Sequence, residues 1–267
     1  MSAAASNATA SNTVASNTAA SNAADPAWPA TPTEGLIYTI AGLLAGCRHV
    51  AVGAASPIPG AAALYTRAVS EGATRVSVLG SRRHNAFTNG GVELFDLAAQ
   101  KRIDAFFLGG GQIDGEANIN LVGTGSYPQM EVRWSGSFGS AYLYYLVPRV
   151  ILFREEHTRR VFVPRVDFVS APGPRNDGAY RPGGPYALLT SRCLFDFDPA
   201  RRRFVLRSVH PGHTVEEVRE HTGFDFDAPA IVPPTPQPDD AALALIRGRI
   251  RDEIGETYPN FAAQLAA

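Results

Sequence analysis

The feature that most constrains the fold is an alternation of short apolar runs with helically spaced apolar residues along the first part of the chain. Runs at 49–54, 75–79 and 103–108 have the length and composition of buried strands. Between them, apolar residues recur at helical spacing over 36–46 and 57–72, and each stretch ends at a glycine. Because strand–helix–strand units at this spacing pair in parallel through right-handed crossovers, we predict a parallel α/β sheet.

From residue 147 onwards the pattern changes to strands with short connections. We expect strands at 150–153, 161–169, 186–190, 193–197 and 204–209, followed by helices at 214–221 and 239–254. The predicted fold class is therefore α/β: an open, mainly parallel sheet with flanking helices and a strand-rich second half.

The N-terminus is a low-complexity segment in which Ala-Ser-Asn recurs every five residues from Ala5. Small and polar residues of this kind cannot form a core, so we expect residues 1–32 to be a disordered tail and 33–267 to form one α/β domain. The segment lacks the charged start of a secretory signal, since the first arginine is Arg48.

Composition excludes several function classes. The formal net charge is −1, which provides no basic field for nucleic acid or anionic lipid. Cys47 and Cys193 are too few for a disulfide framework and show no metal-ligand spacing, so we expect no metal site and a cytoplasmic, reduced protein. No apolar run reaches the roughly 18 residues of a membrane span, and no membrane association is expected.

The most informative segment for chemistry follows the strand at 103–108 and reads GGGQID, with two asparagines shortly after it. Open α/β sheets place their ligands at this end of a strand, and glycines let the backbone approach a bound group. We expect ligand-binding roles for Gly109, Gly110, Gly111, Gln112 and Asn118. A glycine-rich turn whose asparagines only satisfy loop backbone explains the same pattern equally well.

Three motifs resemble the β subunits of family I coenzyme A transferases, the glutaconate CoA-transferase type. GGGQIDGEANIN at 109–120 resembles the GGAQID–x–x–GNVN signature, and VDFVSAPG at 166–173 resembles VDYVTSPG. HPGHTVEEV at 210–218 with TGFD at 222–225 resembles the ending HPG–x–T–x–E–x–V … TGFD. The motifs occur in the family's order, and the resemblance covers about residues 48–255.

The resemblance implies the CoA-transferase fold and an active site shared with an α-type partner subunit, in a heterodimer, an α2β2 assembly or a larger one. The substrate is then a coenzyme A thioester, and no cofactor is bound permanently. Family members move CoA between carboxylates through a glutamate of the β-type chain. The resemblance also implies oxyanion stabilisation by Asn120 as a catalytic residue and by a glycine loop at Gly136 and Gly139.

The chain departs from the family pattern at three positions. Leu79 stands where the family has its nucleophilic glutamate, and leucine cannot form an anhydride or a thioester. Phe138 replaces a glycine of the oxyanion loop, and Ala117 replaces the glycine before the asparagines.

These departures leave alternatives to CoA transfer. The related ring-opening acyl-CoA hydrolases of steroid degradation do not use the β-chain glutamate, and in that case His84 is a candidate catalytic residue because histidine titrates near neutral pH. The loop at 81–85 is otherwise a solvated surface loop. A different class of protein, a non-catalytic CoA-binding scaffold subunit, is also consistent with the departures from the family pattern at Leu79, Phe138 and Ala117.

Two basic or polar motifs have simpler structural interpretations. The three arginines at 201–203 fit a solvated hairpin turn better than a clamp for a CoA phosphate. Thr214 and Glu217 have the spacing of a capping box at the start of a helix.

Overall fold

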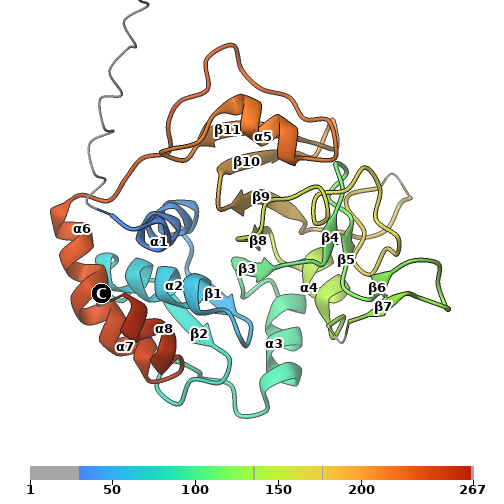
Figure 1. The fold of residues 1–267 in the computed structure, drawn as a ribbon. Helices are drawn as coiled ribbons and strands as arrows, with labels where there is room; N and C mark the ends of the chain where they lie inside the picture. Colours follow the sequence, from blue (N-terminus) through green and yellow to red (C-terminus); the bar gives the residue numbers. More distant parts are fainter. Residues whose placement is uncertain (1–29, 135, 176, 266–267) are drawn as a thin grey trace, which may run out of the picture.

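The computed structural model describes residues 30–134, 136–175 and 177–265. Within these residues the centre of the molecule is a seven-stranded sheet in the order β11-β10-β9-β8-β3-β1-β2 (Figure 1). The strands are β1 (His49–Val52), β2 (Arg75–Val78), β3 (Ala105–Leu108), β8 (Arg149–Arg154), β9 (Pro185–Thr190), β10 (Cys193–Asp198) and β11 (Arg203–Val209).

The sheet is mainly parallel, as the alternation of elements predicts. Strands β2, β1, β3, β8 and β9 pair in parallel, whereas β10 pairs antiparallel with both β9 and β11. The open parallel architecture and the strand-rich second half are therefore confirmed.

Helices cover both faces of the sheet and divide the core in two. One side carries α1 (Pro32–Leu43), α2 (Pro57–Val69) and the C-terminal helices α6 (Asp240–Leu245), α7 (Arg251–Gly255) and α8 (Pro259–Gln264), with a π-helical turn at Ile246–Ile250 between α6 and α7. The other side carries α3 (Gly90–Ala99) and α4 (Ser140–Leu146). Side chains alternate between the two cores along each strand: Val50 and Val52 enter the first, and Ala51 enters the second.

Two short hairpins extend from the carboxyl side of the parallel strands (Figure 1). They are β4 (Gln112–Ile113) with β5 (Ile119–Asn120), and β6 (Gly123–Thr124) with β7 (Val132–Arg133). Sequence patterns did not indicate these two-residue strands, because they are too short to show periodicity. Helix α3 was not predicted either, since it begins with two glycines.

The strand predicted at 161–169 is wrong. This segment is an irregular connection that packs on the β4–β5 hairpin, with an isolated bridge between Phe162 and Ile113. Four of its apolar residues are buried, which produced the strand-like pattern, but Pro164 has no N–H for a ladder. The four are Val161, Phe162, Val163 and Val166.

Helix boundaries follow local capping chemistry. Helix α5 (Val215–His221) begins with the predicted capping box, in which the Thr214 side chain accepts from the Glu217 amide and the Glu217 carboxylate accepts from the Thr214 amide. The predicted helix at 239–254 starts after Asp239, whose Oδ1 accepts from the amide of Ala242 at 2.8 Å. In the described part of the chain, none of the helices is both long and apolar enough to cross a membrane. Of the tail predicted at residues 1–32, residues 1–29 lie outside the described residues, whereas Ala30 is buried, Thr31 caps α1 and Pro32 begins this helix.

Two histidines join elements in the second half of the chain. His157 Nδ1 lies 2.8 Å from Thr190 Oγ1, and its Nε2 lies 2.9 Å from Thr222 Oγ1. Burial, followed by the positive charge of Arg192, lowers the pKa of His157 to about 3. Burial likewise lowers the pKa of His210 to about 4. Both imidazoles are therefore neutral hydrogen-bonding groups of the core.

These pKa values predict a loss of stability in mild acid. Histidine in the unfolded chain binds a proton near pH 6.5, whereas folded His157 and His210 do not, so the unfolded state binds more protons and stability falls as pH falls below about 6.5. The free energy of unfolding should decrease by up to about 1.4 kcal/mol per pH unit for each histidine between about pH 6 and pH 4. Urea titrations at several pH values measure this slope. A His157→Gln variant should be less stable near neutrality and show a shallower slope; identical slopes would contradict the role of His157.

Candidate active site

A cavity of about 730 Å³ lies at the carboxyl ends of β1, β2 and β3. The carboxyl ends of parallel strands meet at one edge of the sheet, and ligands of open α/β sheets bind there. Leu79, which directly follows β2, lines this cavity together with Gly109, Gly110, Gly111 and Gly136. The structure thus brings the replaced glutamate position and the glycine-rich turn into one site.

The cavity wall is largely apolar. Its aromatic and aliphatic lining consists of Leu79, Leu94, Phe95, Phe106, Phe107, Leu108, Leu121, Trp134, Phe138 and Leu143. No aspartate or glutamate lines it in the described part of the chain. A carboxylate nucleophile for this cavity therefore has no source among those residues.

Two arginines supply the charge of the cavity wall. Arg154, at the end of β8, and Arg160 both pair with the carboxylate of Glu156, at 3.1 and 2.6 Å. The Nε of Arg154 is buried and lacks a hydrogen-bond partner among the described residues. An anionic group of a ligand would satisfy this donor. No sequence pattern indicated a role for these arginines, because their proximity to the glycine turn depends on the pairing of β8 with β3.

The ring of Trp134 packs against the glycine turn at Gly111. A Cβ at Gly111 would overlap the ring of Trp134, and one at Gly110 would lie 2.8 Å from Ile119. The amide of Gly111 donates to the carbonyl of Asn120 at 2.9 Å. Glycine is thus needed here because side chains of the hairpins occupy the space that a Cβ would fill.

Asn120 lies behind this turn and not in the cavity wall. Its side chain is fully buried, and Nδ2 donates to Gln112 Oε1 at 2.8 Å and to the carbonyl of Gly123 at 2.6 Å. Its Oδ1 accepts from the amides of Val122 and Gly123. Both amide hydrogens are therefore used within the protein. A role as a catalytic oxyanion donor requires one of these bonds to be exchanged, and it stays a prediction.

The other polar residues of the motif are engaged in the same way. Gln112 Nε2 donates to Asp167 at 3.2 Å, and its Oε1 accepts from the Asp167 amide at 2.9 Å. Asn118 Nδ2 donates to both carboxylate oxygens of Asp114 at 3.1 Å, while its Oδ1 accepts from the amide of Gly173. Neither residue lines the glycine-walled cavity. Direct ligand contacts by Gln112 and Asn118 remain predictions, whereas the hydrogen bonds give both a structural role in the hairpin.

The expected oxyanion loop carries an exposed aromatic ring. Phe138 is 83% exposed and lies 5.5 Å, centroid to centroid, from Phe95. Gly139 precedes α4 with φ 65°, a left-handed conformation that glycine adopts without strain, and a Cβ there would overlap the ring of Phe95. Gly136 lines the cavity and Gly139 sets the start of the helix, so the two glycines contribute differently.

His84 faces away from the cavity, toward the C-terminal helices. Its Nδ1 lies 2.9 Å from Nη1 of Arg67, which also pairs with Glu253 of α7 at 2.7 Å. Burial, and then the charge of Arg67, lowers the pKa of His84. Next to it, Glu256 accepts from the Ser81 hydroxyl and the Arg82 amide, which anchors the loop at 81–85 to the C-terminal segment. His84 does not line the cavity, and its catalytic role stays a prediction.

A metal centre has no support in the described residues, where no group of three or more His, Cys, Asp or Glu side chains is arranged to hold an ion. Cys193 is buried beside Thr190, and burial raises the pKa of its thiol to about 12. It is therefore a packed core residue and not a nucleophile.

Comparison with known proteins identifies the family. The model of the coenzyme A transferase family matches residues 48–221, well over half of the chain. The chain belongs to the coenzyme A transferase family. The motifs that indicated this resemblance lie largely inside the matched segment.

Relatives in this family include both transferases and a hydrolase. The chain is 32% identical over 152 residues to one of the subunits of 3-oxoadipate CoA-transferase from Pseudomonas knackmussii, covering 55% of this chain and 58% of the relative. It is 32% identical over 160 residues to the cholesterol ring-cleaving hydrolase IpdB subunit of Rhodococcus jostii, covering 58% and 62%. The chain thus spans about three fifths of the length of these curated relatives.

The fold is shared with a solved family member. The structure of glutaconate coenzyme A-transferase from Acidaminococcus fermentans superimposes with a TM-score of 0.71 and 25% identity, covering 82% of this chain and 94% of that chain. The CoA-transferase fold implied by the motifs is therefore confirmed.

The hydrogen bonds of Asn120 predict that it is required for stability. Replacement by alanine removes the Asn120 partner of the Gly123 carbonyl and of the Val122 and Gly123 amides. Each buried group left unsatisfied costs about 1–3 kcal/mol, so Asn120→Ala should lower the free energy of unfolding by about 3 kcal/mol or more. Urea denaturation of the full chain measures the change. Asn89→Ala is a suitable control, because Asn89 is exposed and makes no side-chain cap to α3, and a change below about 0.5 kcal/mol is expected. An Asn120→Ala protein as stable as the control would contradict the structural role.

Proposed function

We propose that this chain is the β-type subunit of a two-chain enzyme of the coenzyme A transferase family that acts on an acyl-CoA thioester. The observation that carries the proposal is the shared cavity, in which the position after β2 and the glycine turn after β3 line one apolar wall. Main-chain donors beside such a wall stabilise a developing oxyanion more strongly than they would in water. The 3-oxoadipate CoA-transferase and glutaconate coenzyme A-transferase relatives support transfer of CoA between carboxylic acids.

The absence of an acidic side chain from the cavity wall of the described residues suggests a catalytic role for the α-type partner. Because no acidic side chain of the described residues lines the cavity, the acid or nucleophile of the reaction has to come from the α-type chain across the open side. The exposed rings of Phe138 and Tyr142, next to the cavity on α4 and the preceding loop, give this side an apolar surface suited to such a partner. Within the cavity, Arg154 and Arg160 bind the anionic end of the acyl group or of the acceptor acid.

A second candidate is a ring-opening acyl-CoA hydrolase, as in steroid degradation. Leu79 favours it, since hydrolytic or carbon–carbon cleavage at a thioester-bearing ring does not need a glutamyl thioester on the β-type chain. The similarity to the IpdB subunit points in the same direction.

The full chain, purified together with its α-type partner, provides the test of this function. Acyl-CoA is incubated with and without a second carboxylic acid, and the products are separated by chromatography. A new acyl-CoA formed only with the acceptor supports transfer, whereas acceptor-independent loss of the substrate supports hydrolysis. Binding of CoA without turnover of a broad acyl-CoA panel would instead make the chain a scaffold subunit and would reject both enzyme assignments.

Restoring the carboxylate should move the chemistry toward transfer. In Leu79→Glu, a carboxylate enters the cavity wall beside the glycine turn, where it can attack the acyl carbon of a thioester, forming an acyl–glutamyl anhydride and releasing the CoA thiolate. The thiolate can then attack the glutamyl carbonyl, which releases the acyl carboxylate and leaves CoA bound to the glutamate as a thioester. We expect CoA exchange in the assembled enzyme to increase by about tenfold or more, together with a covalent CoA adduct that hydroxylamine removes. Leu79→Gln has the same size without the nucleophile and should show neither effect. Equal behaviour of the two variants would contradict the placement of Leu79 at the reacting centre.

A further inference from the structure

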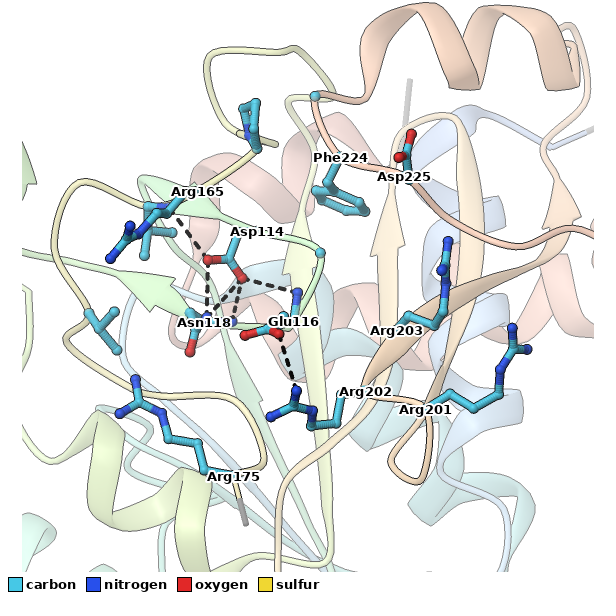
Figure 2. A pocket seen from close by; sticks show the side chains of 15 residues that line it. Asp114, Glu116, Asn118, Arg165, Arg175, Arg201, Arg202, Arg203, Phe224 and Asp225 are labelled. Atoms are coloured by element: carbon cyan, nitrogen blue, oxygen red, sulfur yellow. Dashed lines mark hydrogen bonds and ion pairs between the residues drawn. The ribbon is translucent and has the colours of Figure 1, made fainter. Parts of the chain in front are cut away.

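A second cavity, of about 720 Å³, lies on the far side of the β4–β5 hairpin from the glycine turn. Four segments form it: the hairpin turn from Asp114 to Asn118, the loop from Pro164 to Arg175, the turn between β10 and β11, and the stretch from Gly223 to Asp225. Figure 2 shows Arg165 and Arg175 on one side of the hairpin turn and Arg201, Arg202 and Arg203 on the other. Five arginines and three carboxylates line this concave surface, and Asp227 pairs with two of the arginines, which leaves an excess of one positive charge.

The carboxylates near the cavity differ in their contacts, and Asp225, which lines the cavity, is exposed. Asp114 accepts hydrogen bonds from the amides of Glu116 and Asn118 and from the Asn118 side chain, so its charge is used to hold the turn. Glu116 lies 3.6 Å from Arg202 across the cavity. Arg201 and Arg203 both pair with Asp227, at 2.6 and 3.2 Å.

Two of the five arginines have no such partner. Among residues 30–134, 136–175 and 177–265, no carboxylate pairs with Arg165 or Arg175, and both side chains are exposed. The contact of Arg202 is long, and its side chain is 41% exposed, so its guanidinium is open to a stronger acceptor. Arg165, Arg175 and Arg202 line the same cavity, and a multivalent anion there would accept bidentate hydrogen bonds from their guanidinium groups.

The rest of the cavity suits a small molecule with an apolar portion. Phe224 and Gly115 line it side by side, where a Cβ on Gly115 would lie 3.1 Å from Phe224. Val166 and Val169 add an apolar wall near Arg165. On the opposite side, Arg202 has φ 52°, a strained conformation for arginine in the turn that brings its side chain to Glu116 and the cavity.

We propose that this arginine cavity binds the phosphate groups of a phosphorylated small molecule, with Arg165, Arg175 and Arg202 as the anion ligands. Phosphate oxygens match the fork of a guanidinium, and the apolar wall accepts the remainder of the molecule. The phosphate belongs either to a free nucleotide or to the nucleotide end of a CoA thioester; the chemistry of recognition is the same. The CoA case rests on the proposed function, whereas binding of a free nucleotide does not.

Calorimetric titration of the full chain tests the site with three probes: adenosine 3′,5′-bisphosphate, inorganic pyrophosphate and adenosine. The two phosphate-bearing probes should bind and adenosine should not, and binding should weaken as salt is added. In the double variant Arg165→Gln/Arg175→Gln both affinities should fall by about tenfold or more. Both side chains are exposed, so the variant is expected to fold; circular dichroism and thermal melting verify this.

The matched control is Arg207→Gln. Arg207 lies on β11, in the β10–β11 hairpin that also carries Arg202, but outside the cavity, and it pairs with Asp196 at 3.3 Å. It should bind the probes like the parent protein. Absence of phosphate binding, or equal affinity in the double variant and the parent, would overturn the proposal.

The source of the phosphate is resolved by comparing CoA with 3′-dephospho-CoA. If the double variant loses affinity for CoA but not for 3′-dephospho-CoA, the site holds the 3′-phosphate of a thioester substrate. If CoA binding is unchanged while the bisphosphate is lost, the site takes a free nucleotide. Acyl-CoA turnover is measured separately in the assembled enzyme, so failure of the proposed reaction and failure of this site are distinguishable.

Discussion

The structure depends on the buried amide of Asn120. Its four hydrogen bonds join the two short strands β4 and β5 to the start of β6, and through Gln112 they reach Asp167 in the following connection. A two-stranded ribbon of this length has little stability of its own. Because the amide satisfies main-chain and side-chain groups that are buried or partly buried, it holds the hairpin in one conformation and fixes the glycines before it at the edge of the sheet.

That fixed hairpin separates two chemically different surfaces. On one side the glycine turn faces an apolar cavity whose charged lining consists of two arginines, Arg154 and Arg160, in the described residues. On the other side the same hairpin ends in a turn surrounded by arginines. The two cavities are separate because Gly111 and Glu116 lie at opposite ends of the β4–β5 hairpin. One rigid element thus positions groups for an apolar ligand portion and for an anionic one.

Much of the fold could be predicted from the sequence because its core strands have strong local signals. Strands β1, β2 and β3, and the helices α1 and α2, are continuous apolar or amphipathic runs, and the family motifs supplied the topology that local patterns do not. The segment at 161–169 shows the limit: Phe162 and Val166 are buried by a neighbouring hairpin and not by sheet pairing, and burial alone leaves the same pattern in both cases.

The site was predictable only in part. The meeting of Leu79 with the glycines at 109–111 follows from strand order, because both segments leave the carboxyl ends of parallel strands. The inward hydrogen bonds of Asn120 and the contact of His84 with Arg67 depend instead on tertiary contacts that sequence spacing does not encode.

The packing of Trp134 against Gly111 is another such contact, and it provides an intrinsic fluorescence probe. The chain has two tryptophans, and this indole forms part of the cavity wall beside the glycine turn that follows β3. A compound that enters the cavity changes the polarity around the ring, and movement of the turn changes the ring's distance from the neighbouring backbone. Emission from this side chain therefore follows occupancy and backbone motion at the same place, without an attached dye.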